Sequence, residues 1–127
     1  MGPDTVRTLH VWQEGIAVVR DSYALTAGWP KSEMFGLTNQ VRRAAVSIPS
    51  NLAEGKGRGS RGELVRFARI APGSTYELDT LLQIATELKF SDDSTIMALQ
   101  NRLSCLARRI STYIQSHNPR PTTYSPS

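Results

Sequence analysis

Seven basic side chains gather between residues 42 and 69 of this 127-residue chain: Arg42, Arg43, Lys56, Arg58, Arg61, Arg66 and Arg69. Only Glu54 and Glu63 oppose them, so this stretch carries +5 while the rest of the chain carries −1 of the total of +4. A guanidinium binds two phosphate oxygens at once, so the stretch predicts a contact with the backbone of RNA or DNA. The alternative is a solvated basic rim that binds no ligand. This alternative stays open because we find no aromatic residues interleaved with the arginines and no known nucleic-acid-binding motif.

A second set of polar residues follows the spacing of one helix face: Gln40, Arg43, Ser47, Asn51 and Glu54. Such side chains form hydrogen bonds between helices or across a subunit contact, and Ser47 and Asn51 could also satisfy backbone groups freed by Pro49. The alternative is a recognition surface with Arg43 and Glu54 as its charged ends. We call these five residues the polar stripe.

The residues of catalytic and metal sites do not group in this sequence. His10 and His117 lie near opposite ends of the chain, and Cys105 is the only cysteine. These residues do not make a zinc site or a nucleophile with its base. The glycines at 55, 57 and 59 follow no predicted strand and precede no Gly-Lys-Ser/Thr, so we expect turn glycines rather than a phosphate-binding loop. We therefore expect no enzyme, no metal and no cofactor.

Apolar residues recur every three or four positions in four stretches, which is the spacing of one face of an α-helix. The four sets are Leu9, Trp12, Ile16, Val19 and Tyr23; Leu37, Val41, Ala44, Ile48 and Leu52; Leu64, Phe67, Ala71, Ser74, Leu78, Leu81, Ala85 and Leu88; and Ile96, Leu99, Leu103, Leu106, Ile110 and Tyr113. Short connections join the stretches, and none alternates as a strand does. The sequence therefore predicts the all-α class, as an up-down-up-down antiparallel four-helix bundle.

Two prolines fall inside the predicted helices. Pro49 should cause a kink or a local break near Ser47, and Pro72 should cause a second kink. Because the apolar spacing keeps its phase on both sides of each proline, we expect packing to outweigh the cost. The third helix should start in a capping box of Ser60 and Glu63, and the fourth should be capped within residues 91–93.

Further apolar residues lie beside the expected core faces: Val11, Val18 and Leu25 in the first helix, and Val65, Ile70 and Ile84 in the third. This surplus predicts self-association of the chain. The alternative is a broad core-facing stripe with scattered surface aliphatic residues.

The length predicts a single domain over residues 1–117, followed by a disordered tail over 118–127 that is rich in proline and serine. No apolar run approaches the ~20 residues of a membrane span, and the first residues lack the apolar core of a secretory signal. With one cysteine, these features predict a cytoplasmic protein with no membrane contact.

Two long stretches, EMFGLTNQVRRAAVSIPSNLAEGKGR at 33–58 and ELVRFARIAPGSTYELDTLLQIA at 63–85, together with LHVWQEG near the start, carry a family resemblance. The chain resembles the four-helix bundle family named after the intervening-sequence-encoded protein of bacterial 23S ribosomal RNA, also called S23. Pro72 departs from the family's pattern. The resemblance implies a homopentamer related to the accessory variability proteins of diversity-generating retroelements, which associate with nucleic acid and a reverse transcriptase.

These observations lead to one expectation and one rival. The expectation is a non-enzymatic, homo-oligomeric accessory protein that binds RNA or DNA through the arginines of residues 42–69. The rival is an interaction scaffold that docks a partner protein, such as a reverse transcriptase, without nucleic acid. The two differ in their response to salt, because only a phosphate binder loses affinity linearly in log salt.

Overall fold

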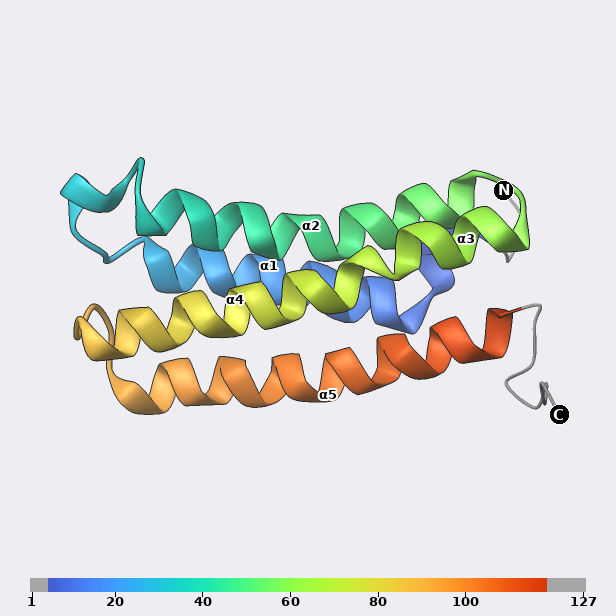
Figure 1. Cartoon of the computed structure of the whole chain (residues 1–127). Coiled ribbons are helices and arrows are strands. Elements are labelled where there is room, and N and C mark those ends of the chain that lie inside the picture. The colour runs from blue at the N-terminus through green and yellow to red at the C-terminus, as the bar shows by residue number, and fades with distance from the viewer. Residues whose placement is uncertain (1–4, 119–127) are drawn as a thin grey trace, which may run out of the picture.

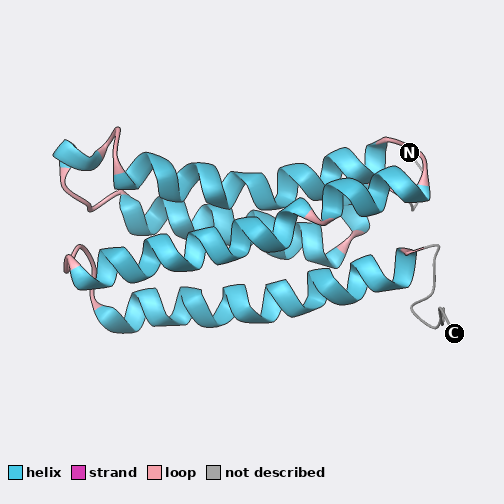
Figure 2. Cartoon of the chain, in the orientation of Figure 1, coloured by secondary structure: helices cyan, strands magenta, loops and turns pink. Residues whose placement is uncertain are grey.

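The computed structural model describes residues 5–118, and this part of the chain contains helices and no strand (Figure 2). The α-helices are α1 (His10–Thr26), α2 (Leu37–Gly57), α3 (Arg61–Ala68), α4 (Ile70–Glu87) and α5 (Asp93–His117). Two 3-10 turns, η1 (Val6–Thr8) and η2 (Lys31–Glu33), precede α1 and α2. Residues 119–127 of the expected tail lie outside the described residues.

Four long helical segments, which we call arms, lie side by side, and each runs antiparallel to the one before it (Figure 1). The third arm consists of α3 and α4, which are separated by the single residue Arg69. This residue keeps a right-handed helical backbone, with φ −67° and ψ −17°, so the arm continues across the break. The predicted all-α four-helix bundle is therefore confirmed.

The two prolines have different effects. Pro72 falls in the first turn of α4, and its missing N–H leaves the carbonyl of Ala68 without its helical donor, which places the break at Arg69. Pro49, in contrast, lies inside α2, which is assigned as one helix from Leu37 to Gly57. The local break expected near Ser47 is absent. Pro49 is buried against α1, and this packing offsets the lost hydrogen bond.

The buried face of α1 differs from the one that the sequence predicted. Its buried residues are Val11, Gly15, Val18, Ser22 and Thr26, whereas Ile16 and Tyr23 are 39% and 43% exposed. Leu9, Trp12 and Val19 are only partly buried. The prediction was wrong by about one residue, or about 100° of rotation.

Small residues explain this rotation. A Cβ added to Gly15 would lie 3.3 Å from Cβ of Pro49, so α1 approaches α2 closely at this point. Counting apolar side chains gives no weight to Gly15, Ser22 or Thr26, although their small size allows that approach. Val11 and Val18, expected on a free flank, are therefore core residues.

The other core predictions are largely confirmed. All five predicted residues of α2 are buried, and so are the predicted residues of α5 except Tyr113, which is partly buried. In the third arm, which contains α3 and α4, Leu88 is 54% exposed and Phe67 is partly buried. Of the expected flank residues, Val65 is buried, whereas Ile70 and Ile84 are 46% and 41% exposed.

Side-chain caps define two helix starts. Ser60 Oγ accepts a hydrogen bond of 3.1 Å from the amide of Glu63 at the start of α3. Asp92 accepts one of 3.0 Å from the amide of Thr95 at the start of α5. Hydrogen bonds from Ser94 and Thr95 lower the pKa of the Asp92 carboxyl to about 2. None of the described helices is long and apolar enough to cross a membrane.

Candidate nucleic-acid interface

The close packing of α3 against the end of α2 depends on Gly55. A Cβ added to Gly55 would lie 2.8 Å from the carbonyl oxygen of Leu64 and 3.1 Å from Cβ of Phe67. Only glycine therefore allows α2 and α3 to lie this close. The expectation of three turn glycines was wrong in part, since Gly55 and Gly57 are in α2 and only Gly59, with φ +85°, forms the turn.

This close approach brings two arginines to one aromatic ring. The guanidinium carbons of Arg58 and Arg66 lie 4.8 Å and 4.4 Å from the centroid of the Phe67 ring. The expectation that no aromatic residue interleaves with the arginines was therefore wrong, because both arginines contact the ring of Phe67. Here, however, the ring supports the arginines, in contacts worth about 0.5–1 kcal/mol each at exposed sites.

Two carboxylates orient the same arginines. Arg58 Nη2 lies 2.8 Å from Oε2 of Glu54, and Arg66 Nε lies 2.9 Å from Oε2 of Glu63. A second bond of 3.1 Å, from Arg66 Nη2 to Oε1 of Glu63, makes that pair bidentate. The hydrogen bond from Arg66 also lowers the pKa of the Glu63 carboxyl, so both groups of this pair are charged at neutral pH.

Three further cations lie along the same segment: Lys56 in the last turn of α2, Arg61 at the start of α3, and Arg69 between α3 and α4. Within residues 5–118 none of them forms an ion pair with an acidic side chain. We call Lys56, Arg58, Arg61, Arg66 and Arg69 the basic corner. Together with Glu54 and Glu63 it carries a net charge of +3.

Arg42 and Arg43 do not belong to this corner, although the sequence grouped them with it. An α-helix rises 1.5 Å per residue, so Arg43 is about 22 Å from Arg58 along α2. Arg42 instead donates a 2.9 Å hydrogen bond from Nε to Oγ1 of Thr26 and lies over the ring of Tyr23 at 4.4 Å. The prediction of one seven-residue cluster was wrong, because nearness in sequence along a straight helix is not nearness in space.

The centre of the polar stripe joins α2 to α4. Ser47 Oγ lies 2.7 Å from Oγ of Ser74, and Asn51 Nδ2 donates to the Ser47 carbonyl at 2.8 Å and to its Oγ at 3.1 Å. This is a hydrogen bond between helices, as suggested for the stripe. Pro49 frees the carbonyl of Ala45, which Asn51 does not contact, so that part of the expectation was wrong. Gln40 and Arg43, at one end of the stripe, are exposed.

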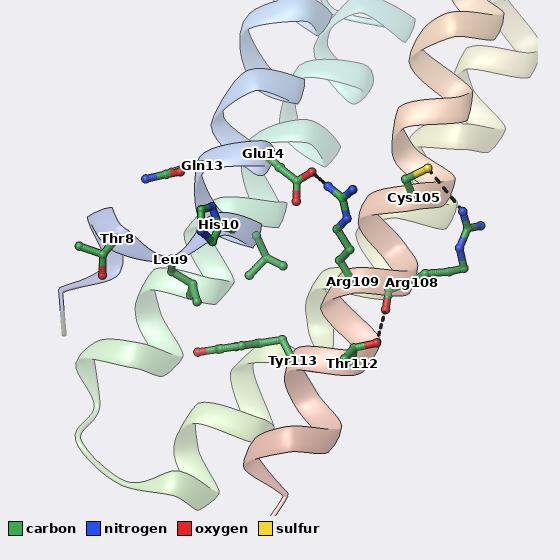
Figure 3. A pocket seen from close by; sticks show the side chains of 11 residues that line it. Thr8, Leu9, His10, Gln13, Glu14, Cys105, Arg108, Arg109, Thr112 and Tyr113 are labelled. Carbon is green, nitrogen blue, oxygen red and sulfur yellow. Dashed lines mark hydrogen bonds and ion pairs between the residues drawn. The ribbon is translucent and has the colours of Figure 1, made fainter. Parts of the chain in front are cut away.

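A groove that the sequence did not indicate runs between α1 and the second half of α5 (Figure 3). It has a volume of about 790 Å³. Arg109 reaches across it to the carboxylate of Glu14, and Arg102 forms a similar pair with Asp21 further along the two helices. The seven-residue spacing of Arg102 and Arg109 was the available signal, since it places both on one face of α5.

The groove contains Cys105, which is exposed and accepts a 3.4 Å contact from Arg108. Tyr113 also lines it, and burial raises the pKa of the Tyr113 hydroxyl. His10, in the first turn of α1, also lines the groove (Figure 3). Across the described residues, no three histidine, cysteine or acidic side chains come together as metal ligands.

The fold and the basic corner define a class: small helical bundles with a cluster of cations on two consecutive helices. The sequence model of the 23S rRNA-intervening sequence protein family matches residues 7–112, and the chain belongs to this family. No match is found among functionally curated proteins.

A solved structure supports the same fold. It is a protein of unknown function from the S23 ribosomal protein family of Bacteroides thetaiotaomicron, with a TM-score of 0.73 and 16% sequence identity. The match covers 83% of this chain and 98% of that one. At this identity the similarity concerns the fold alone.

Proposed function

We propose that the protein is a non-enzymatic, homo-oligomeric accessory protein that binds the backbone of RNA or DNA through the basic corner. The observation that carries the proposal is the group of five cations that runs from the last turn of α2 to the end of α3, three of which have no acidic partner among the described residues. Phosphates are the ligands that such a group favours. The name of the family refers to an intervening sequence of 23S rRNA, which makes RNA the first ligand to test.

Arg58 and Arg66 fit this role despite their carboxylate partners. Each pair lies on the surface, with the arginine side chains 46% and 61% exposed, so each contributes little to stability and is screened by salt. The pairs and the Phe67 ring hold the guanidinium groups in place before a ligand arrives. A phosphate therefore meets oriented donors, and less side-chain entropy is lost on binding.

Self-association is the second part of the proposal. Val11 and Val18 are core residues, so the exposed apolar residues that support self-association are Ile16 on α1, Ile70 and Ile84 on α4, and Leu88 directly after α4. Five copies, the number that the family resemblance implies, would carry +20 and repeat the basic corner around one axis. Light scattering at micromolar concentration should give a multiple of 14.0 kDa, and a monomer mass would overturn this part.

The groove between α1 and α5 favours the rival function, a scaffold for a partner protein. Its two walls are joined by one ion pair at the surface, between Arg109 and Glu14, which a partner helix could replace at little cost. On this alternative, a partner such as a reverse transcriptase would bind the groove and nucleic acid would not bind the basic corner.

A matched pair of triple variants separates the two functions. The first changes Arg58, Arg61 and Arg66 to glutamine; the control changes Arg20, Arg102 and Arg109 to glutamine. Each variant removes three positive charges and two surface ion pairs. The first also removes the two arginine contacts with the Phe67 ring, and the control removes two links between α1 and α5.

Affinity for several unrelated RNAs and DNAs at low salt should fall for the first variant, by a similar factor for every sequence, and change little for the control. Folding should be nearly untouched in both, since exposed charges contribute within about 0.5 kcal/mol. If the wild type binds no nucleic acid, or if both variants bind alike, the scaffold is the better account.

A further inference from the structure

A second surface, at the other end of α2, combines exposed aromatic rings with arginines. It is a groove of about 540 Å³ where the end of α1 meets the start of α2. We call its six principal residues the Phe35 platform: Tyr23, Met34, Phe35, Arg42, Arg43 and Val46. The sequence placed Tyr23 in the core and gave Phe35 no role, so the platform appears only in the fold.

Phe35 is the most exposed large apolar side chain of the described residues, at 94%, and its apolar neighbours are exposed as well. Met34 is 46% exposed, Tyr23 43% and Val46 39%. A single exposed apolar residue needs no explanation, whereas four that line one groove form a patch of the kind that marks a binding site.

The backbone holds Phe35 in its exposed position. The amide of Met34 donates to the Lys31 carbonyl at 3.1 Å, and the amide of Gly36 donates to the Glu33 carbonyl at 2.9 Å. The Glu33 carboxylate accepts a 3.0 Å hydrogen bond from the amide of Leu37 and so caps α2. Phe35 is thus fixed between two anchored turns, and a ligand that stacks on it does not have to order this segment.

The charge of the platform selects an anion. Arg42 is fixed over the Tyr23 ring at 4.4 Å, and Arg43 is exposed and forms no ion pair within residues 5–118. None of the described residues that line the groove is acidic. An exposed aromatic face beside two unneutralised guanidinium groups is the arrangement with which proteins bind single strands, where the base stacks and the phosphate pairs with arginine.

We propose that the Phe35 platform binds an unpaired nucleotide of a single-stranded nucleic acid, with the base stacked on Phe35 and the phosphate near Arg43. This inference rests on the proposed function and adds to it a preference for unpaired segments. The basic corner contacts the backbone of any strand, because phosphates are always accessible. The platform requires a free base face, which a duplex hides within its stack.

Three single variants test the platform. Phe35→Ala removes the ring, Phe35→Trp keeps a stacking surface, and Tyr76→Ala removes an aromatic ring that is 69% exposed on another surface, between α4 and α5. The probes are a fluorescein-labelled 15-nucleotide mixed-sequence RNA, a DNA of the same sequence, and the duplex of each, measured by anisotropy at one salt concentration.

For single strands, Phe35→Ala should weaken binding roughly fivefold to 150-fold, which corresponds to the ~1–3 kcal/mol lost with one stacked base. Phe35→Trp and Tyr76→Ala should bind them as the wild type does, and no variant should change the affinity for a duplex. Unchanged single-strand binding by Phe35→Ala overturns the platform, even if the basic corner behaves as proposed. An equal loss for single strand and duplex overturns it too.

The two proposals fail in different ways. The triple variant of Arg58, Arg61 and Arg66 should weaken single strands and duplexes together, whereas Phe35→Ala should weaken single strands alone. If only the triple variant has no effect, the basic corner is wrong and the platform stands. If Phe35→Ala instead lowers the mass measured by light scattering and leaves single-strand binding intact, the patch is a contact between copies of the chain and the platform is overturned.

Discussion

Gly55→Ala should destabilise the fold because the added methyl group meets backbone rather than a movable side chain. The Cβ would lie 2.8 Å from the Leu64 carbonyl oxygen and 3.2 Å from the Leu64 Cα. Alanine favours a helix by up to ~1 kcal/mol over glycine, and less in the last turn. Forcing an extra methyl group into a tight contact costs about 1–3 kcal/mol, and a backbone contact belongs at the upper end. We therefore expect a net loss of about 2 kcal/mol.

Gly57→Ala is the matched control, two residues along the same helix. Nothing lies within 4 Å of the Cβ that it would add, and its φ is not positive. Alanine there should leave stability unchanged or raise it by about 0.4–1 kcal/mol. Thermal unfolding followed by circular dichroism, at one protein concentration, should show Gly55→Ala melting about 8 °C below the wild type and Gly57→Ala at or above it. If the two variants melt alike, the close approach of α2 and α3 is not as described.

Three further predictions test the core, a helix cap and the link between α2 and α4. Val18→Ala should cost about 2 kcal/mol, because Val18 is 1% exposed, whereas Ile16→Ala should cost under ~1 kcal/mol; the reverse order in urea unfolding would restore the core face that the sequence suggested. Because the pKa of Asp92 is lowered from 3.8 to about 2, its stabilising effect is complete above pH ~4 and is lost as the pH falls through about 2. The wild type should therefore lose more stability than Asp92→Asn over that range, and parallel acid titrations of the two would contradict this. Ser47→Ala and Ser74→Ala should each cost about 1 kcal/mol, and a double-mutant cycle should show coupling above ~0.5 kcal/mol, since the two hydroxyls lie 2.7 Å apart; fully additive losses would mean that this bond contributes nothing.

The bundle could be predicted from the sequence because the spacing of large apolar residues indicates which face of a helix is buried. All five predicted core residues of α2 are buried, and the predicted residues of α5 all face the core. The core face of α1 could not be predicted in this way, since it is formed partly by Gly15, Ser22 and Thr26. The contribution of such small residues to packing can be recognised only when the neighbouring helix is known.

The site was predicted in part for a similar reason. Charge counting found the basic residues but placed Arg42 and Arg43 with the rest, although about 22 Å of helix separates Arg43 from Arg58. The stacking of Arg58 and Arg66 on Phe67 depends on the close contact at Gly55, which no spacing rule contains. Phe35 was missed because a large apolar side chain is expected inside a protein, whereas here the capped turn before α2 holds it outside.

The salt dependence of RNA binding tests the central claim most directly, because it counts phosphate contacts. The logarithm of the binding constant should fall linearly with the logarithm of salt concentration. Changing Arg58, Arg61 and Arg66 to glutamine should reduce the slope by up to about 0.9 for each lost duplex phosphate contact, or about 0.7 on a single strand. The control variant at Arg20, Arg102 and Arg109 should keep the wild-type slope. A wild-type affinity that does not change with salt, or a slope that the first variant leaves unchanged, would contradict binding of nucleic acid by the basic corner.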